Sequence, residues 1–422
     1  MSGPVVEPLR ERALDVLARN LRGAWTCPSS AIYPHQWLWD SCFVAIGLAR
    51  TDPERAAGEV RSLLRGQWAN GMFPHMIFAT GVRDVGSRRL WQSSRYPDAP
   101  RGVNTSCITQ PPIIAIAAQR VSDALAANAR RDFLTELMPH IVAYHQWLYR
   151  ERDLHGRGLV TLIHPWECGL DTTPAWTVPL ASAWQPWWLR LVHRFRLARL
   201  ARFLRRDTRY IPAAQRSSDD DGLRMLALAR TGRRYGFDAR RLPPERALIV
   251  EDLAFNAFLV VANRALEQLA RDVGLEIDAA LQRSMRATEA ALEELWEERA
   301  GQYFSRNEST GELITIPTIA TFLPLWAGVD PEHAVRLVEQ LHQPQWATAW
   351  PVPSVPTDAA EFDPARYWQG PSWLNMNWAI VQALSRCGVP DLAHRLARRT
   401  LEMVEQGGFS EYFSPLTGQG FG

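Results

Sequence analysis

The period of the hydrophobic residues limits the possible folds more than any other feature of this sequence. Apolar residues recur at intervals of three and four along most of the 422 residues, which is the pattern of amphipathic helices, and the alternation typical of strands is nearly absent. The chain is therefore predicted to be all-α. The pattern predicts helices over residues 7–21, 40–50, 54–67, 109–128, 131–150, 181–206, 221–232, 246–271, 275–298, 318–327, 331–342, 371–386 and 390–405.

The predicted helices are of two kinds. Residues 275–298 present many charges outward, whereas residues 109–118 (TQPPIIAIAA) carry no charge. The first kind suits an outer ring and the second an inner ring, an arrangement that predicts an α/α barrel with its site where loops meet at one end. The sequence has no repeat of the kind that marks an open solenoid. With no boundary between two compositions, residues 1–422 are interpreted as one domain.

The long segments between helices are expected to be functional, because structureless loops of this length are uncommon in compact domains. They contain most of the Trp, Tyr, Pro and Gly residues, and they are 22–39, 68–107, 152–180, 343–370 and 406–422. Residues 205–245 differ, since they are dense in Arg and Asp. This segment is either a solvated excursion or a lid that meets the substrate.

Composition excludes several classes of protein. All 47 basic residues are arginine, so chemistry that needs a lysine amine, such as a Schiff base or a GxxxxGK[ST] phosphate loop, is excluded. A net charge of +2 does not favour binding to nucleic acid. Five cysteines without a CxxC pair predict neither a disulfide framework nor a zinc site, and they favour a reducing cytoplasm.

Targeting and membrane signals are also weak. The first twenty residues are charged and lack the apolar core of a signal peptide. The apolar run from Ile113 to Ala118 falls far short of the ~20 residues that cross a bilayer. We therefore expect a cytoplasmic protein without a membrane partner.

Two loops place carboxylates beside aromatic residues. HPWECGLD (164–171) contains Glu167 and Asp171, and GGFSEYF (407–413) contains Glu411. A neighbouring like charge and an apolar wall both raise the pKa of a carboxyl group, as a general acid requires near neutral pH. Each acid also has a plainer interpretation: Glu167 braces its loop, Asp171 begins a helix, and Glu411 is incidental to a tail.

Two further loops join aromatic rings to polar groups. YPHQWLWD (33–40) ends in Asp40, which could instead cap the following helix, and YWQGPSWLNMNW (367–378) places Pro371 in the predicted first turn of a helix. None of the four loops supplies a Ser-His-Asp order, a metal triad or a glycine-rich phosphate cradle. Glycosidases need two carboxyl groups, and pyranose rings pack on aromatic planes, so the four loops favour glycoside chemistry.

Six segments in order resemble glycoside hydrolase family 63, and the chain is similar in size to the compact bacterial mannosylglycerate and glucosylglycerate hydrolases within it. The segments are YPHQWLWDS (33–41), TSCITQPP (105–112), HPWECGLD (164–171), VEDLAFNA (250–257), YWQGPSWLNMNW (367–378) and GFSEYFSPLTG (408–418). The resemblance implies an (α/α)6 barrel and hydrolysis with inversion at the anomeric carbon.

The resemblance also implies roles for individual residues. Asp171 matches the family's general acid and Glu411 its general base, and inversion would require their carboxyl groups to lie ~6.5–9.5 Å apart. Glu167 is expected to be a supporting acid within the substrate site. The positions that match sugar-binding residues are Tyr33, Trp39, Asp40, Gln110, Tyr367, Gly370 and Trp373.

The sequence departs from the family pattern in two places. In relatives that cleave glycerate glycosides, an Arg and a Tyr six positions later approach the glycerate carboxylate; Arg216 matches the Arg, but Gly222 takes the place of the Tyr, and three aspartates lie between them. Arg216 still offers the fork that binds carboxylates. The chain also stops eleven residues after Glu411, where relatives continue with a helix, so Glu411 would be poorly positioned in a barrel left open there.

The main hypothesis is an inverting glycosidase acting on a small α-glycoside, with mannosylglycerate or glucosylglycerate as first candidates. Because both catalytic groups would be side chains, no cofactor is expected. One alternative is a noncatalytic carbohydrate-binding or scaffold protein on the same barrel. Another is a sugar epimerase, which would place histidines in the pocket, where only His35, His75 and His164 lie in suitable loops. The sequence leaves open the hexose, the leaving group, and whether the protein is a homo-oligomer.

Overall fold

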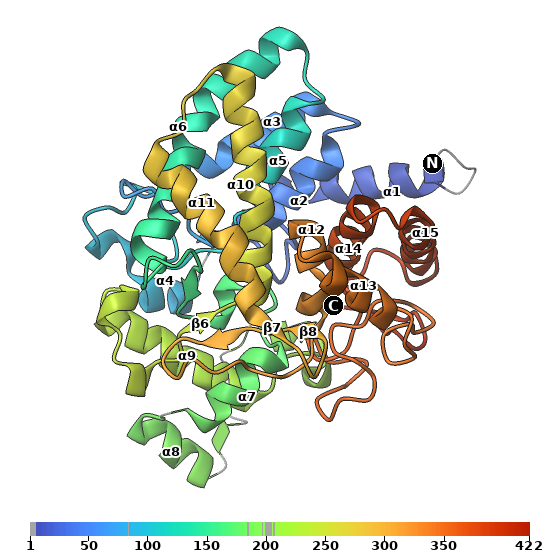
Figure 1. The fold of residues 1–422 in the computed structure, drawn as a ribbon. Coiled ribbons are helices and arrows are strands. Elements are labelled where there is room, and N and C mark those ends of the chain that lie inside the picture. The colour runs from blue at the N-terminus through green and yellow to red at the C-terminus, as the bar shows by residue number, and fades with distance from the viewer. Residues whose placement is uncertain (1–5, 83, 184, 196, 199–204, 206) are drawn as a thin grey trace.

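The computed structural model describes residues 6–422 except 83, 184, 196, 199–204 and 206 (Figure 1). Helices dominate these residues. Their bounds are α1 (Val6–Arg19), α2 (Leu38–Leu48), α3 (Pro53–Leu63), α4 (Val85–Trp91), α5 (Ile113–Ser122), α6 (Ala127–Arg152), α7 (Pro174–Ser182), α8 (Trp187–Arg194), α9 (Asp219–Arg234), α10 (Leu253–Val273), α11 (Ala279–Ala291), α12 (Pro324–Ala327), α13 (Pro331–Gln340), α14 (Leu374–Arg386) and α15 (Pro390–Gly407).

Helices of inner and outer character alternate along the chain, as the two kinds of sequence predict. Among the described helices, the consecutive pairs α2 with α3, α5 with α6, α10 with α11 and α14 with α15 are in contact, and α7 contacts α9 across the intervening α8. The inner helix α5 is buried on nearly every side, whereas the outer helix α11 buries only a stripe that includes Leu281 and Met285. Burial on one side or on all sides is thus decided by the distribution of charge along each helix.

Aromatic contacts join successive inner helices. Phe258 on α10 meets Trp326 on α12 edge to face, with ring centroids 6.2 Å apart, and Trp326 meets Trp378 on α14 at 5.3 Å. Trp378 in turn meets Phe43 on α2 at 5.7 Å. The first and last inner helices are therefore packed against each other, which brings the N-terminal and C-terminal loops to one site.

The described strands are short, which agrees with the near absence of strand-like alternation in the sequence. Each of β1 (Leu21–Arg22), β2 (Trp25–Thr26), β3 (Gln36–Trp37), β4 (Met76–Ile77), β5 (Thr161–Leu162), β6 (Val250–Glu251), β7 (Trp296–Glu297), β8 (Gln302–Tyr303), β9 (Arg306–Asn307), β10 (Tyr412–Phe413) and β11 (Gly420–Phe421) has two residues. All described pairings are antiparallel, in the orders β1–β2, β3–β4, β5–β6–β9, β7–β8 and β10–β11. Some of these pairings, such as β3 with β4 and β5 with β6, join loop segments that are far apart in the sequence.

The helix predicted over 181–206 is wrong in its bounds. Pro186 separates α7 from α8, and part of the predicted range lies outside the described residues. The prediction of one helix over 109–128 is also wrong, because Pro112 precedes α5 and a turn after Ser122 leads into α6. Two helices escaped the sequence analysis, α4 and α7, since both lie in segments interpreted as loops.

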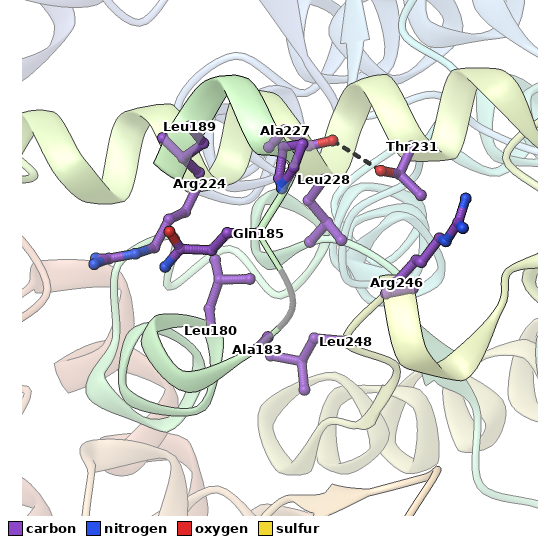
Figure 2. Close-up of a pocket in the computed structure, with 12 residues that line it drawn as sticks. Leu180, Ala183, Gln185, Leu189, Arg224, Ala227, Leu228, Thr231, Arg246 and Leu248 are labelled. Carbon is purple, nitrogen blue, oxygen red and sulfur yellow. Dashed lines mark hydrogen bonds between the residues drawn. The ribbon is translucent and has the colours of Figure 1, made fainter. Parts of the chain in front are cut away.

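Helix α8 projects from the body at the bottom of Figure 1 and contacts α9 through its one buried residue, Leu189, through the pair of His193 with Asp220, and through Trp188, over which Arg230 lies. Leu189 is 1% exposed and, with Leu228 on α9, lines a small pocket of about 20 Å³ between α7, α8 and α9 (Figure 2). A space of that size holds about one water molecule. The pocket is therefore a small gap in the packing of α7, α8 and α9, and it is too small to hold a sugar.

None of the helices formed by the described residues combines the length and hydrophobicity needed to span a membrane.

Candidate active site

Three carboxylates and a set of aromatic rings share one cavity of about 570 Å³. The carboxylates are Asp40 in the first turn of α2, Asp171 in the loop before α7, and Glu411 immediately before β10. The rings that line it come from both ends of the chain: Tyr33, Trp37, Trp39, Phe43, Tyr367, Trp368, Trp373 and Phe409. Acids inside an aromatic wall are the combination expected for binding and cleaving a sugar.

The loop that carries Asp171 is fixed from below by Glu167. This side chain is completely buried, and both of its oxygens bond the guanidinium of Arg152, at 2.8 and 3.0 Å. The same oxygens accept the backbone N–H groups of Thr109 at 3.2 Å and Ile163 at 2.8 Å. Glu167 thus lies beneath the cavity and braces its loop, which is the plainer of its two sequence interpretations.

Gly169 allows the loop to touch the aromatic wall. Its φ is +79°, a left-handed conformation, and a Cβ at this position would lie 2.4 Å from Cη2 of Trp39. Trp39 is held in turn by its backbone N–H, which donates to Oε1 of Gln110 at 3.2 Å. The glycine therefore sets the contact between the Asp171 loop and the start of α2.

Asp171 and Asp40 are placed where ionisation is unfavourable. Burial, followed by the charges of Glu411 and Asp40, raises the pKa of Asp171 well above its usual value. Burial and the charge of Glu411 raise the pKa of Asp40 to about 7. A carboxyl group with a raised pKa retains its proton near neutrality and can donate it.

Glu411 is mounted on a hairpin. Its N–H donates to the carbonyl of Phe421 at 2.9 Å, beside the pairing of β10 with β11. Gly422 lies against the glutamate, because a Cβ there would be 2.4 Å from Cβ of Glu411. Residues 420–422 thus fold back onto Glu411 and hold it from one side.

Arg216 reaches Glu411 from the Arg- and Asp-rich segment 205–245. Its Nη1 donates to Oε2 of Glu411 at 2.7 Å, and its guanidinium lies 4.1 Å from the ring centroid of Tyr367 and 5.6 Å from that of Tyr33. Burial raises the pKa of Glu411, while Arg216 acts in the opposite direction by charge and hydrogen bond. A cation therefore stabilises the charged form of Glu411, whereas no cation is among the causes of the pKa shifts of Asp40 and Asp171.

The aromatic wall offers both planes and polar edges. Trp368 and Trp373 stack at 3.8 Å with 4° between their planes, and Trp373 stacks on Tyr412 at 5.0 Å. Among the described residues, the Tyr33 hydroxyl and Trp37 Nε1 are buried polar atoms of the cavity wall that meet no hydrogen-bond partner. Buried polar groups are normally satisfied, so these two are suited to the hydroxyl groups of a ligand.

Most of the residues predicted for the site line the cavity. They are Tyr33, Trp39, Asp40, Gln110, Asp171, Tyr367, Trp373 and Glu411. Glu167 lies beneath the cavity. Arg216 is not among the residues that line it and contacts the site through its hydrogen bond to Glu411. Gly370 lies behind the wall, where a Cβ would be 2.3 Å from the carbonyl oxygen of Asp363 and its N–H donates to Ser354 Oγ at 2.9 Å.

Several sequence interpretations need correction. Asp40 is not the N-cap of its helix, because α2 begins at Leu38 and Asp40 lies within the first turn. Pro371 is not in a first turn either, since α14 begins at Leu374. Two tryptophans near Asp171 in the sequence are not among the residues that line the cavity: Trp166 stacks on His75, and the indole N–H of fully buried Trp176 donates to Asp252.

Sequence reasoning missed two groups that hold the site. Arg152, the partner of Glu167, closes α6, and Asp207 bonds Nε of Arg216 at 3.3 Å. Arg152 could have been noticed as an arginine at the end of a long predicted helix. Nothing in the sequence distinguishes Asp207 from the other acidic residues near it. The described residues contain no group of three His, Cys, Asp or Glu side chains that could hold a metal ion.

Comparison with known proteins extends the resemblance to nearly the whole chain. Residues 33–422 match the family described as the mannosylglycerate hydrolase MGH1-like glycoside hydrolase domain. The chain is 38% identical to a mannosylglycerate hydrolase of Thermus thermophilus, over 97% of this chain and 96% of the relative. It is 32% identical to a glucosylglycerate hydrolase of Mycolicibacterium hassiacum, over 98% of this chain and 94% of the relative.

A solved structure gives the same result. The crystal structure of a GH63 mannosylglycerate hydrolase from Thermus thermophilus in complex with Tris and D-glycerate matches 98% of this chain and 96% of its own, with a TM-score of 0.87 and 36% identity. These findings confirm the all-α barrel of the (α/α)6 kind and a glycoside hydrolase, in place of the noncatalytic and epimerase alternatives. The chain belongs to the mannosylglycerate hydrolase MGH1-like family of glycoside hydrolases, within glycoside hydrolase family 63.

Proposed function

We propose that this cavity hydrolyses a small α-glycoside with inversion, and that Asp171 is the general acid and Glu411 the general base. The observation that carries the proposal is the difference between two acids of one cavity. Burial and neighbouring carboxylates raise the pKa of Asp171 well above its usual value, whereas at Glu411 the charge and hydrogen bond of Arg216, at 2.7 Å, oppose the rise in pKa that burial causes. Divergent environments of this kind are how paired carboxyl groups acquire opposite roles.

In this mechanism each residue acts on a defined atom. Asp171 protonates the glycosidic oxygen as the bond to the anomeric carbon breaks, and Glu411 accepts a proton from the water that attacks the opposite face. The ring of Trp39 supports the sugar ring, while Asp40 and Gln110 bond its hydroxyl groups. The Tyr33 hydroxyl, buried without a protein partner, is a further donor for the sugar.

Mannosylglycerate and glucosylglycerate are the first substrates to test, because the relatives named above carry these activities in their names. The fit of the glycerate half is less direct. Arg216, the cation nearest to Glu411, already bonds that carboxylate and Asp207. A glycerate carboxylate would therefore share this guanidinium or displace one of its two partners.

We also propose that residues 1–422 form one domain and that residues 205–245 serve as a lid in a cytoplasmic enzyme. The support for a lid lies in residues 215 and 216. The carbonyl of Gln215 accepts the Tyr412 hydroxyl and, at 3.2 Å, the N–H of Tyr367, while Arg216 bonds Glu411. Displacing this segment would uncover the proposed base.

The test is turnover by purified wild-type, Asp171→Asn and Glu411→Gln proteins on mannosylglycerate, glucosylglycerate and neutral α-disaccharides. We expect each variant to lose at least ~100-fold in kcat, within the usual contribution of a general acid or base. Glu402→Gln on the outer helix α15 is the matched control, because this residue does not line the cavity. Near wild-type activity in either site variant would refute the assignment.

Proton NMR of the first anomer released tests the stereochemistry separately. Release of the inverted anomer is expected, because one carboxyl group activates water instead of attacking the sugar. Release of the retained anomer would exclude Glu411 as a base and would require a covalent intermediate.

A further inference from the structure

A chain of alternating charges joins the lid segment to the proposed base. Arg205 binds Asp207 through two hydrogen bonds, at 2.7 Å from Nη2 to Oδ2 and 3.2 Å from Nε to Oδ1. Oδ2 of Asp207 also accepts Nε of Arg216 at 3.3 Å, and Arg216 donates from Nη1 to Glu411 at 2.7 Å. One guanidinium therefore serves two carboxylates, one outside the cavity and one at its wall.

Arg216 does not depend on Asp207 to remain in place. Its side chain is 4% exposed, and its guanidinium lies between the rings of Tyr33 and Tyr367. The carbonyl of the preceding residue, Gln215, is fixed by hydrogen bonds from Tyr412 and Tyr367. Removing the Asp207 charge would leave the cation beside Glu411, with Glu411 as its nearest remaining carboxylate.

We propose that Asp207 is a positioning residue: by holding the Nε edge of Arg216, it prevents the guanidinium from closing on Glu411 as an exclusive pair and keeps that carboxylate able to accept a proton from water. The inference rests on the proposed role of Glu411 as base. An exclusive ion pair with a buried guanidinium would make the carboxylate a weaker base, and general-base catalysis weakens as the proton affinity of the base falls.

The surroundings of Glu411 determine the sign of the effect. The titratable and charged groups that face Glu411 or act on it are Asp40, Asp171, Asp207, Arg216, Tyr367 and Tyr412. The charge of Asp207 favours the protonated form of Glu411, and Arg216 favours the ionised form. Loss of Asp207 and loss of Arg216 should therefore move the titration of the base in opposite directions.

The test is the pH profile of kcat/KM, whose acid limb reports the base in the free enzyme. In Asp207→Asn the acid limb should move to lower pH and the plateau should fall by roughly tenfold, less than the ~100-fold or more that complete loss of a general base costs, because Glu411 is weakened and not removed. In Arg216→Gln the limb should move to higher pH. Asp220→Asn is the matched control, because Asp220 lies in the same segment but pairs with His193 at 3.1 Å, and its profile should stay at the wild-type position.

An acid limb that stays in place or moves upward in Asp207→Asn would overturn the inference, even if activity falls, because a merely structural role predicts loss without that shift. Should Asp207→Asn not fold, Asp207→Glu carries the test: it retains the charge, so the limb should stay at the wild-type position, and a displaced limb would refute us. Glu411→Gln separates the two proposals. If it retains turnover, the base assignment fails; if it is inactive while the Asp207→Asn limb is unmoved, only the role of Asp207 fails.

Discussion

Replacing Gly169 with alanine should damage the site through one contact. The residue has φ of +79°, and an added Cβ would lie 2.4 Å from Cη2, 2.5 Å from Cζ3 and 2.9 Å from Cζ2 of Trp39. Real Cβ atoms do not approach a ring so closely, so either the Trp39 ring or the loop that carries Asp171 must move by about 1 Å. Both belong to the cavity wall.

Two costs add in Gly169→Ala. The left-handed backbone costs roughly 1–2 kcal/mol for any residue with a Cβ. Overpacking against a buried ring costs about 1–3 kcal/mol more. The free energy of unfolding should therefore fall by about 2–5 kcal/mol. A displacement of about 1 Å at a catalytic group is worth on the order of 100-fold in activity, so kcat/KM should fall by about that factor.

Gly81 provides the control. It has the same φ of +79°, but a Cβ added there would meet no heavy atom within 4 Å, and the residue is exposed. Gly81→Ala should thus show only the backbone cost of roughly 1–2 kcal/mol, with unchanged kcat/KM. Urea unfolding and steady-state kinetics on both variants measure the two quantities. Equal losses of stability and activity in the two variants would refute the argument that the Trp39 contact positions the loop.

Two further changes test the electrostatics of the cavity. Glu167→Gln should lower the free energy of unfolding by about 3–5 kcal/mol, because it leaves buried Arg152 without its carboxylate partner; a loss below about 1 kcal/mol in urea unfolding would show that the pair is not needed. Asp40→Asn should raise Tm increasingly as pH rises from about 4 to about 7, and calorimetry at both pH values checks this. The pKa of Asp40 is raised to about 7 in the fold, so across that interval the folded state holds a proton that the unfolded state has released, and wild-type stability falls with pH. A Tm gain independent of pH would contradict it.

The sequence could predict the barrel because charged residues are concentrated in the outer helices and are rare in the inner ones. This difference in composition can be recognised without knowing which helices are in contact. It could also predict the cavity wall, since Tyr33, Tyr367 and Trp373 lie in loops that enter inner helices, and Trp39 and Asp40 lie in the first turn of such a helix. Helix ends were less predictable. Proline positions decide them, and Pro186 interrupts an apolar period that otherwise continues.

Roles that depend on distant partners could not be predicted. The spacing of Glu167 and Asp171 does not show which of the two carboxylates faces the cavity. In the fold, Arg152 at the end of α6 bonds Glu167, which braces the loop, and Asp171 is left in the cavity. The pairing of Arg216 with Glu411 joins residues 195 positions apart. No local pattern encodes such a contact, because it follows from how the lid segment is packed.

The two proposed catalytic groups are controlled by different parts of the molecule, and this has a kinetic consequence. Asp171 is carried by a loop fastened to α6, and its protonation follows from burial and from acids of the wall. Glu411 takes its counter-charge from Arg216, which belongs to residues 205–245, the segment proposed as a lid. A change in residues 205–245, the proposed lid, should therefore act first on the acid limb of the pH profile, which reports the base. The alkaline limb, which reports Asp171, should respond only through the charge of Glu411, so its displacement should be the smaller of the two.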